Sequence, residues 1–420
     1  MRIAVIGSGA RENALAWSLN KDRNHQVWVL PGNAGWHPSV SIQVDDFPSI
    51  EKFCIENKIE LIVAGQEKSL ALGIQDILGK KFCVFGPSRE AARLESSKIW
   101  AKQFMERNSV LTAPFSIVTS TQEAKAVIDK WKGDCVIKWD GLAAGKGVAV
   151  CSELNDAHAA LDGFLSKFSS TEFVIERRLK GREISVFIAT NGRQYVMLPP
   201  AKDYKRAFDQ DEGPNTGGMG AVSCDSLMSD TLKERIKSKI IDPTLQGLQK
   251  ENIPYMGFLY FGLMICEDEP FLLEYNVRLG DPEASAILAR LETSVLDIIT
   301  ACMESSLDSL NLIVKEDPSV AIVIASNGYP ESYKTGYLIN GLENVGSQDL
   351  IFHAGTKTGG KGILSSGGRI LNCVACGTNI KEARSKAYGL AQKLDIAYSF
   401  YRQDIGEDCF EEESRYLNIR

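Results

Sequence analysis

The sequence predicts an α/β protein with a parallel sheet near its N-terminus, and three observations indicate this fold class. Short apolar segments at 2–6, 26–30, 59–64 and 82–85 alternate with segments of helical periodicity. Strands separated by helices are typical of parallel sheets built from βαβ units. A chain of 420 residues exceeds what one hydrophobic core normally holds, so we expect two to four domains.

The first domain is expected to span residues 1–105 and to be Rossmann-like. A helix at 12–20 follows the first strand, and a helix at 50–57 precedes the third. Further helices over 89–108 follow the fourth strand, which ends in a Gly-Pro-Ser turn. This order of elements predicts a parallel sheet covered by helices.

Two further regions are expected, at 106–315 and 316–420. In the first, a small α+β lobe over about 112–188 is predicted from strands at 134–138, 147–151, 173–176 and 183–189 and a helix at 154–165. Larger α/β structure then resumes, with helices at 232–251 and 282–292 around an apolar strand at 257–265. The last region is expected to be a mixed α+β domain with a strand at 320–325, many glycine turns and a helix at 380–394.

Composition excludes several classes of protein. The formal net charge of −7 argues against a general nucleic-acid binder, whose affinity rests on Lys and Arg. No apolar run approaches the roughly 20 residues that span a bilayer, and the short first apolar run is a strand rather than a signal peptide. Ten scattered cysteines indicate reduced thiols and a cytoplasmic location, and only four histidines make zinc chemistry improbable.

The end of one apolar strand carries a pair of oxygen donors. Glu274 and Asn276 follow the short strand 271–273 two residues apart, so their side chains point the same way. Oxygen ligands in that arrangement suit a hard cation such as Mg²⁺. Arg278 and Asp281 follow at a Gly-Asp-Pro turn, where a polar substrate could bind. For the Glu-x-Asn pair alone, a solvated strand end is the alternative.

A glycine loop at residues 7–12, Gly-Ser-Gly-Ala-Arg-Glu, stands between the first strand and the first helix. Backbone amides at a helix N-terminus bind phosphate, and Arg11 could add a contact. The loop departs from the dinucleotide fingerprint at Glu12, and the second strand lacks the acid that binds ribose. A plain tight turn is the alternative.

Two segments suggest nucleotide binding. Lys138 ends a strand and leads into a loop containing Gly145 and Lys146, where glycines let backbone amides approach an anion. It is not a Walker P-loop, because a strand follows, and a hairpin with a basic tip is the alternative. The connector between Glu176 and Glu183 could meet an adenine edge and ribose, or simply join two strands.

A long loop between Asp203 and Gly220 combines acids, a Lys-Arg pair and four glycines. Loops of this kind are poor core material and usually bind a ligand.

These motifs, in this order, resemble the ATP-grasp ligases and within them the phosphoribosylamine–glycine ligase (glycinamide ribonucleotide synthetase) family. The resemblance covers essentially the whole chain, and its most specific segments are the opening glycine loop and Gly-Pro-Asn-Thr-Gly-Gly-Met-Gly at 213–220. It implies ATP-grasp central domains with the small lobe as a lid. It also implies a carboxylate–amine ligase of purine biosynthesis that uses ATP and Mg²⁺ (or Mn²⁺) to join glycine to 5-phosphoribosylamine through a glycyl phosphate.

The resemblance also implies residue roles. ATP phosphates would be held by Lys98, Lys138, Gly145 and Lys146, adenine by Glu176, Arg177 and Leu179, and ribose by Glu183. The metal would be held by Glu274 and Asn276. The glycine and amine site would be lined by Asp203, Arg278 and Asp281, with substrate contacts from Gly9, Arg11, Asn215, Thr216, Gly217 and Gly218. A monomer or small homo-oligomer is expected, without nucleic-acid or membrane partners.

The chain departs from the family pattern at several positions, which leave other functions open. Ala10, Asn13, Gln66 and Trp139 differ from the usual residues, and the segment 167–171 lacks the glycines of the loop that covers ATP phosphates in the family. The alternatives are a paralogous ATP-grasp ligase acting on a different acid or amine, and a nucleotide-binding regulatory protein. The short segment further predicts incomplete lid closure.

Overall fold

Four parallel strands in the order β2-β1-β3-β4 form the N-terminal sheet of the computed structural model, which describes residues 1–21, 24–141, 147–168 and 171–417. The central strand β1 is paired on both sides, and its Ile3 and Val5 are fully buried. The predicted parallel sheet is therefore confirmed. Its elements are β1 (Arg2–Gly7), α1 (Ala10–Leu19), β2 (Gln26–Pro31), α2 (Phe47–Glu56), β3 (Leu61–Ala64), α3 (Glu67–Ala71), α4 (Ile74–Leu78) and β4 (Cys83–Phe85).

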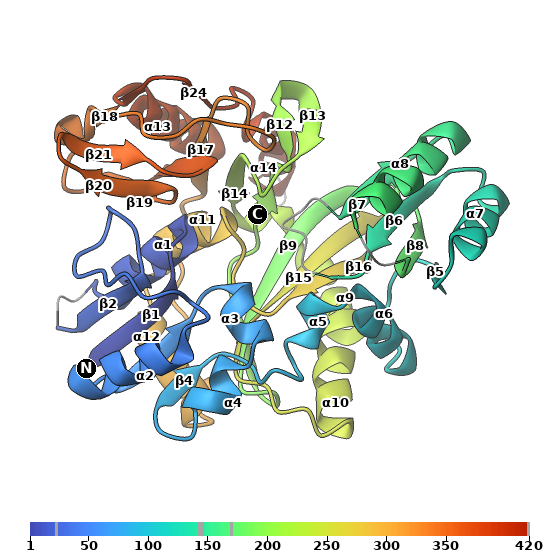
Figure 1. The fold of residues 1–420 in the computed structure, drawn as a ribbon, viewed down its shortest axis with the longest axis horizontal. Helices are drawn as coiled ribbons and strands as arrows, with labels where there is room; N and C mark the ends of the chain where they lie inside the picture. The colour runs from blue at the N-terminus through green and yellow to red at the C-terminus, as the bar shows by residue number, and fades with distance from the viewer. Residues whose placement is uncertain (22–23, 142–146, 169–170, 418–420) are drawn as a thin grey trace.

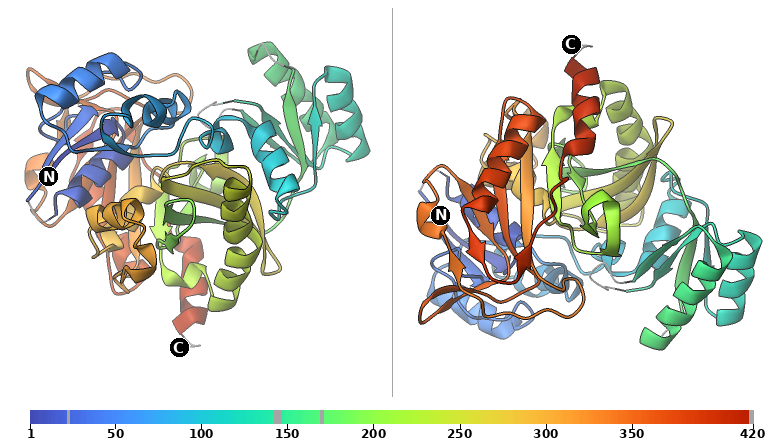
Figure 2. Two further views of the ribbon diagram at one scale, coloured as in Figure 1. Left: turned by 90° about the horizontal axis from the view of Figure 1, so that it is seen from below. Right: turned by 90° about the horizontal axis from the view of Figure 1, so that it is seen from above.

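A small lobe with its own hydrophobic core projects from one side of the molecule (Figures 1 and 2). It follows α5 (Arg93–Ser96) and α6 (Lys98–Arg107) and contains β5 (Phe115–Val118), α7 (Thr121–Lys130), β6 (Cys135–Trp139), β7 (Val148–Cys151), α8 (Leu154–Lys167) and β8 (Phe173–Arg177). Its strand order is β5-β8-β6-β7. The strand predicted at 183–189 does not belong to this sheet, because β9 (Arg182–Thr190) pairs along its whole length with β15 (Gly257–Cys266).

The central sheet has the order β10-β9-β15-β16, with β10 at Tyr195–Met197 and β16 at Glu269–Asn276. Glu274 and Asn276 lie within β16 rather than beyond its end, and Glu274 pairs with Gly262 beside a β-bulge. The single helix predicted at 232–251 is three consecutive helical segments: α9 (Asp230–Ile236), a π-helical turn (Lys237–Ile241) and α10 (Asp242–Lys250). Ser229 begins α9 by accepting a hydrogen bond from the Leu232 amide.

The C-terminal sheet includes strands from the middle of the chain. Its order is β11-β14-β17-β22-β19, with β24 also paired to β17. The strands are β11 (Lys202–Asp203), β14 (Gly220–Ser223), β17 (Ser319–Ser326), β19 (Leu350–His353), β22 (Arg369–Cys376) and β24 (Ser399–Phe400). Because β14 pairs with β17, the segment around Asp203 is hydrogen-bonded into the C-terminal sheet.

Helices and hairpins complete the fold. The helices are α11 (Glu283–Arg290), α12 (Val295–Met303), α13 (Ile380–Gln392) and α14 (Phe410–Leu417). The hairpins and the short pair are β12 (Arg206–Phe208) with β13 (Glu212–Asn215), β20 (Thr356–Gly359) with β21 (Gly362–Ser365), and β18 (Ile339–Asn340) with β23 (Asp395–Ile396). Helix α1 packs against α11, which brings the N-terminal glycine loop beside the Gly-Asp-Pro turn.

Two predictions from composition can be compared with the structure. All ten cysteines are free thiols, and most of them are buried. Among the described residues, no helix combines the length and apolar character needed to cross a membrane.

Candidate active site

A cleft of about 1460 Å³ lies where the lobe, the central sheet, the N-terminal loop and the C-terminal domain meet. It brings together most of the residues predicted from sequence. The described members that line it are Arg11, Lys98, Lys138, Glu176, Arg177, Leu179, Glu183, Asp203, Asn215, Thr216, Gly217, Glu274, Asn276, Arg278 and Asp281. Gly145 and Lys146 lie outside the described residues.

A buried carboxylate joins two lysines on the lobe side of the cleft. Glu176 Oε1 lies 2.7 Å from Lys138 Nζ and 3.2 Å from Lys102 Nζ. Lys138 also donates to the Leu273 carbonyl (2.9 Å), and burial lowers the pKa of Lys102 to about 8 although Glu176 opposes the shift. The protein itself therefore supplies Lys138 with a counter-charge, the carboxylate of Glu176. Sequence pattern identified Lys138 and Glu176 but not their contact.

Lys98 opens α6 and reaches the base of the loop that follows β6. Its Nζ donates to the Gly141 carbonyl (2.9 Å), while Asp140 accepts from the Ser97 hydroxyl (3.2 Å) and the Ile99 amide (3.1 Å). Burial lowers the pKa of Lys98, and neighbouring Glu274 acts against that shift. The start of α6 and the start of this loop are thus held together, with an ammonium group facing the cleft.

The connector predicted to meet adenine lies along the same wall. Arg177 donates its backbone amide to the Pro114 carbonyl (2.8 Å), and its guanidinium lies over the Trp131 ring at 5.3 Å. Leu179 lines the cleft. Glu183 accepts from Lys205 Nζ at 3.0 Å, so the carboxylate assigned to ribose already has a cationic partner.

The predicted metal ligands lie at the centre of the cleft. Burial favours the neutral form of Glu274, but nearby Lys205, Lys138, Lys98 and Arg278 outweigh it and lower its pKa. Asn276 Oδ1 accepts from Arg278 Nη2 at 3.2 Å. No three His, Cys, Asp or Glu side chains within the described ranges are close enough to hold a metal alone. The carboxylate oxygen of Glu274 and the amide oxygen of Asn276 fit a Mg²⁺ site in which phosphates and water supply the other ligands.

Arg278 is held by two acids that the sequence analysis did not select. Its Nη2 donates to Glu95 Oε1 (2.8 Å), its Nε lies 3.7 Å from Glu67 Oε2, and Glu95 also accepts from the Val277 amide (2.8 Å). Burial would raise the pKa of Glu67, but Arg278 and Arg11 lower it to about 2. The available signal was an acid, Glu95, in the short helix directly before Lys98.

The N-terminal glycine loop binds a carboxylate of its own chain. Glu12 accepts from the Gly9 amide (2.7 Å) and from Arg11 Nε (2.6 Å), and Arg11 also donates to the Leu279 carbonyl (3.2 Å). A Cβ on Gly7 would lie 2.4 Å from Glu12, so only glycine leaves room for this carboxylate. Glu12 thus occupies the Gly9 amide and Arg11 Nε, while Arg11 still lines the cleft, and the substrate role expected for Gly9 and Arg11 stays a prediction.

Asp203 and Lys205 line the cleft opposite Glu274. Burial and the charges of Glu283, Glu183 and Glu274 raise the pKa of Asp203 to about 7, although Lys205 opposes them. The Asp203 carboxylate makes no hydrogen bond to any described residue. A carboxyl group with this pKa exchanges a proton readily near neutral pH.

The predicted glycine loop closes the C-terminal end of the cleft. Thr216 donates its amide to the Lys205 carbonyl (2.7 Å), and Gly218 donates to Thr216 Oγ1 (2.9 Å). Gly218 has φ +109°, and a Cβ there would lie 2.4 Å from Pro282 Cδ. Both the backbone conformation and the close approach therefore require glycine.

Arg369 joins this loop to Asp281. Its Nη1 donates to the Gly217 and Asp281 carbonyls, both at 2.5 Å, and its Nη2 lies 3.1 Å from Asp281 Oδ2. Asn215 Oδ1 lies 3.5 Å from Arg206 Nη1, and both residues line the cleft. The sequence analysis missed Arg369, whose signal was the Gly-Gly-Arg segment.

Two residues that depart from the family pattern, Trp139 and Asn13, make specific contacts in the structure. Trp139 stacks on Phe168 with ring centroids 4.1 Å apart and planes at 10°. Asn13 Oδ1 accepts from the His353 amide at 2.9 Å, which ties α1 to β19.

Three family descriptions match successive parts of the chain. They are the N domain (residues 1–95), the ATP-grasp (A) domain (residues 96–284) and the C domain (residues 319–408) of phosphoribosylglycinamide synthetase. Together they cover most of the chain.

Named relatives and solved structures are similar over nearly the full length. A phosphoribosylamine–glycine ligase of Ralstonia nicotianae is 39% identical, covering 97% of this chain and 99% of the relative, and one of Vibrio vulnificus is 38% identical over 97% and 98%. The crystal structure of the enzyme of that name from Thermotoga maritima is 35% identical, covers 96% of this chain and 100% of its own, and has a TM-score of 0.83. The biotin carboxylase domain of a Hydrogenobacter thermophilus 2-oxoglutarate carboxylase, solved with MgADP, is only 14% identical, covers 100% and 97%, and its TM-score of 0.71 shows a shared fold alone.

Proposed function

The chain belongs to the phosphoribosylglycinamide synthetase family, and we propose that its cleft joins glycine to 5-phosphoribosylamine using ATP. It is an ATP-dependent carbon–nitrogen ligase of the ATP-grasp fold that acts in purine biosynthesis. ATP phosphorylates the glycine carboxylate, and the amine then attacks the acyl phosphate. The products are glycinamide ribonucleotide, ADP and phosphate.

One observation carries this proposal: four cations, Lys205, Lys138, Lys98 and Arg278, surround the central carboxylate Glu274. ATP and glycine are both anionic, and the first step brings their charges together. Fixed cations in a partly dehydrated cleft reduce that repulsion and stabilise the charge that develops on the transferred group. Lys98 and Lys138 are assigned to the ATP phosphates. Gly145 and Lys146, which lie outside the described residues, are assigned the same role.

Glu274 and Asn276 are assigned to Mg²⁺ or Mn²⁺. When bound, the metal would neutralise charge on the phosphates and orient them. Arg278 shares Asn276 Oδ1 and is held by Glu95, so it is fixed at the side of this pair. Its assigned role is to hold the glycine carboxylate.

Asp203 is assigned as the proton acceptor in the second step. As the amine nitrogen attacks, a C–N bond forms, the C–O bond to phosphate breaks, and the nitrogen must lose a proton. The raised pKa of Asp203 and its lack of a hydrogen-bond partner among the described residues make its carboxylate suited to take that proton. Lys205, paired with Glu183, lies beside it and stabilises the ionised form.

The ribosyl end of the amine is assigned to the C-terminal end of the cleft. Asp281, Asn215, Thr216, Gly217 and Gly218 form that end, and Arg369 supplies a cation there. Leu179, Arg177, Glu176 and Glu183 remain the assigned adenine and ribose wall. We place the reaction in the cytoplasm, which the free cysteines support.

The function is tested by an assay that measures ADP and amide product together. Glycine, freshly made 5-phosphoribosylamine, ATP and Mg²⁺ should give ADP and amide together, and omission of any one should abolish amide formation. A panel of other acids and amines, run in parallel, tests the alternative that the chain is a paralogue with a different substrate. Faster turnover of another pair would overturn the assignment of glycine or of the amine.

A further inference from the structure

The segment from Asp203 to Lys205 has two faces with different partners. Asp203 and Lys205 line the cleft, where Lys205 binds Glu183. The intervening Tyr204 is buried and reaches the opposite way, where its hydroxyl donates to Asp408 and accepts from the Gly406 amide (3.0 Å). Alternate residues of an extended strand point to opposite sides, so fixing Tyr204 fixes the direction of both cleft residues.

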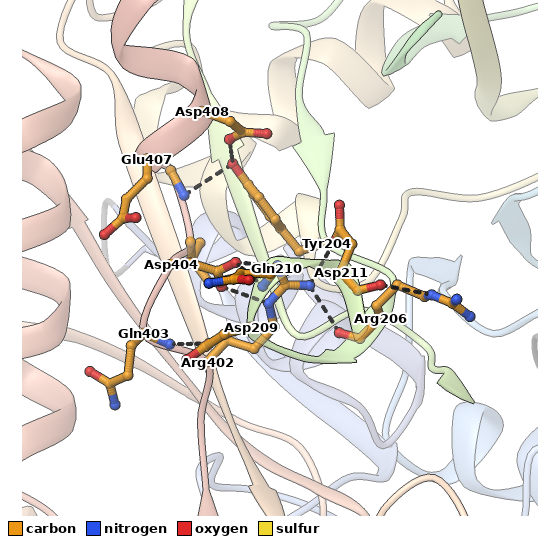
Figure 3. Close-up of polar contacts among 12 residues, drawn as sticks. Tyr204, Arg206, Asp209, Gln210, Asp211, Arg402, Gln403, Asp404, Glu407 and Asp408 are labelled. Carbon is orange, nitrogen blue, oxygen red and sulfur yellow. Dashed lines mark hydrogen bonds and ion pairs between the residues drawn. The ribbon is translucent and has the colours of Figure 1, made fainter. Parts of the chain in front are cut away.

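A buried arginine from the C-terminal segment holds the start of β12, the next part of the chain. Arg402 is 2% exposed. Its Nη1 donates to the Arg206 carbonyl (3.0 Å) and to Asp211 Oδ1 (2.9 Å), and its guanidinium lies over the Tyr204 ring at 5.3 Å. Asp404 binds the other side of the guanidinium at 2.8 and 2.7 Å. Figure 3 shows Arg402 enclosed between Asp404, Asp211 and the backbone of Arg206.

Two backbone contacts extend this connection to the hairpin tip. The Gln210 amide donates to Asp404 Oδ2 (2.8 Å), and the Gln403 amide donates to Asp209 Oδ1 (2.7 Å). The β12–β13 hairpin and the C-terminal segment therefore each supply one backbone amide donor and one carboxylate acceptor to the other (Figure 3). The hairpin leads directly into Asn215 and Thr216 of the cleft loop.

We propose that the segment 402–409 is a clamp, with Arg402 and Tyr204 as positioning residues that orient Asp203, Lys205 and the 215–218 loop for the reaction. The inference rests on the proposed function for the meaning of those cleft residues. It assigns a role in the reaction to a segment about 200 residues away along the chain that touches no substrate.

The buried charges of the clamp are better explained by a need to position the chain accurately than by a need to stabilise the fold. Burying a guanidinium and its acids costs desolvation energy, and apolar residues of similar size often give equal stability. A planar guanidinium, by contrast, fixes the angle and distance of every acceptor it meets. The clamp thus matches a need for exact placement of the strand, because small displacements of reacting groups reduce rates strongly.

Four variants of the full chain test the clamp. Arg402→Gln removes the guanidinium, Arg402→Lys keeps only its charge, and Tyr204→Phe keeps the ring but removes the hydroxyl. Arg107→Gln is the control, because Arg107 lies on α6 and binds Glu251 through Nε and Nη2, outside the clamp. The measurements are KM for each substrate, kcat, and amide hydrogen exchange over residues 202–218.

For Arg402→Gln we expect KM for glycine and for the amine to rise, and kcat to fall, by roughly tenfold to a hundredfold in combination. KM for ATP should change least, because Lys98 and Lys138 lie outside the clamp and only Glu183, through Lys205, connects the nucleotide wall to it. The rate of amide hydrogen exchange should increase at residues 202–218 and remain unchanged in β6 and β8. Arg402→Lys should not restore these values, Tyr204→Phe should show a smaller change of the same kind, and Arg107→Gln should change none of them.

The clamp is overturned if Arg402→Gln leaves exchange and all KM values unchanged, or lowers kcat only in proportion to the folded fraction. If Arg402→Gln does not fold, Tyr204→Phe decides by the same readouts. Hydrogen exchange needs no substrate, so it tests the clamp even where the wild-type protein fails to ligate glycine, a result that would refute the proposed function instead.

Discussion

Lys138 and Glu176 form an ion pair of 2.7 Å between neighbouring strands of the lobe, and both side chains are almost fully buried. Lys102 binds the same carboxylate oxygen at 3.2 Å. Glu176 therefore fixes the positions of both lysines, and Lys138 lies at the end of the cleft assigned to the nucleotide.

Removing this carboxylate should cost both stability and ATP affinity. For Glu176→Gln we expect the free energy of unfolding to fall by about 3 kcal/mol, because two buried ammonium groups lose their counter-charge. Urea unfolding measures the loss, and calorimetry measures ATP binding. Glu251→Gln is the control, since Glu251 pairs with a half-exposed Arg107 and should change stability by less than about 1 kcal/mol. Equal effects of the two substitutions would contradict this account of Glu176.

Replacing Lys138 itself should separate binding from folding. Lys138→Met removes the cation but leaves Glu176 paired with Lys102, so the fold should persist while ATP affinity falls. Calorimetry with ATP and a thermal melt give the two readouts. Unchanged nucleotide affinity would mean that Lys138 serves only to neutralise Glu176.

The central carboxylate should be needed for turnover more than for folding. Glu274→Gln removes one anionic oxygen from the assigned metal pair, so we expect turnover to fall on the order of a hundredfold and the Mg²⁺ requirement to increase. Activity is measured as Mg²⁺ concentration is varied, alongside a thermal melt. Wild-type turnover at ordinary Mg²⁺ would remove Glu274 from the metal site.

Asp203 should give the reaction a pH dependence near neutrality. Its raised pKa of about 7 means that the proton-accepting form grows as pH rises through 7, so kcat/KM should rise over that range. The Asp203→Asn variant should lose this limb. The folded pKa lies above the usual value of 3.8, so the contribution to stability is full below about 4 and is lost as pH rises through 7. Asp203→Asn should therefore melt at a higher temperature than wild type at pH 8, and a lower melting temperature would contradict the burial argument.

The short segment 167–171 predicts that ATP consumption exceeds amide formation, because an exposed acyl phosphate is lost to water. Residues 169–170 lie outside the described residues, but Phe168 stacks on Trp139 at the base of the phosphate loop. Trp139→Ala should raise the ratio of phosphate released to amide formed, and Trp139→Phe should largely preserve it. A ratio of one in wild type at all amine concentrations would show that the short segment is compensated, with Arg177 or Arg178 the first candidates to supply the missing cover.

Local sequence patterns predicted the parallel sheet and the short strand before Glu274, and most of the candidate site residues do line the cleft. These features follow from apolar alternation, turn residues and the spacing of polar side chains, all of which act over a few residues. The strand at 183–189 was assigned to the wrong sheet because its apolar pattern fits either one, and only its pairing with β15 decides between them.

Contacts between distant segments could not be predicted in the same way. Glu176 is 38 residues from Lys138 and 74 from Lys102, and Glu12 fills a loop that resembles a phosphate site. A buried charge is stable only when it is paired, but which residue pairs with it depends on how distant segments pack together. Arg402 is the extreme case, since nothing near it in sequence indicates Tyr204 or Asp211.

The most direct test of the central claim, ligation through a glycyl phosphate, uses glycine labelled with ¹⁸O in its carboxylate. The reaction is run with ATP, Mg²⁺ and 5-phosphoribosylamine, and the released phosphate is analysed by mass spectrometry. If ATP phosphorylates the carboxylate, the phosphate released as the amide forms should carry a single ¹⁸O taken from glycine. Amide formed together with unlabelled phosphate would contradict the account.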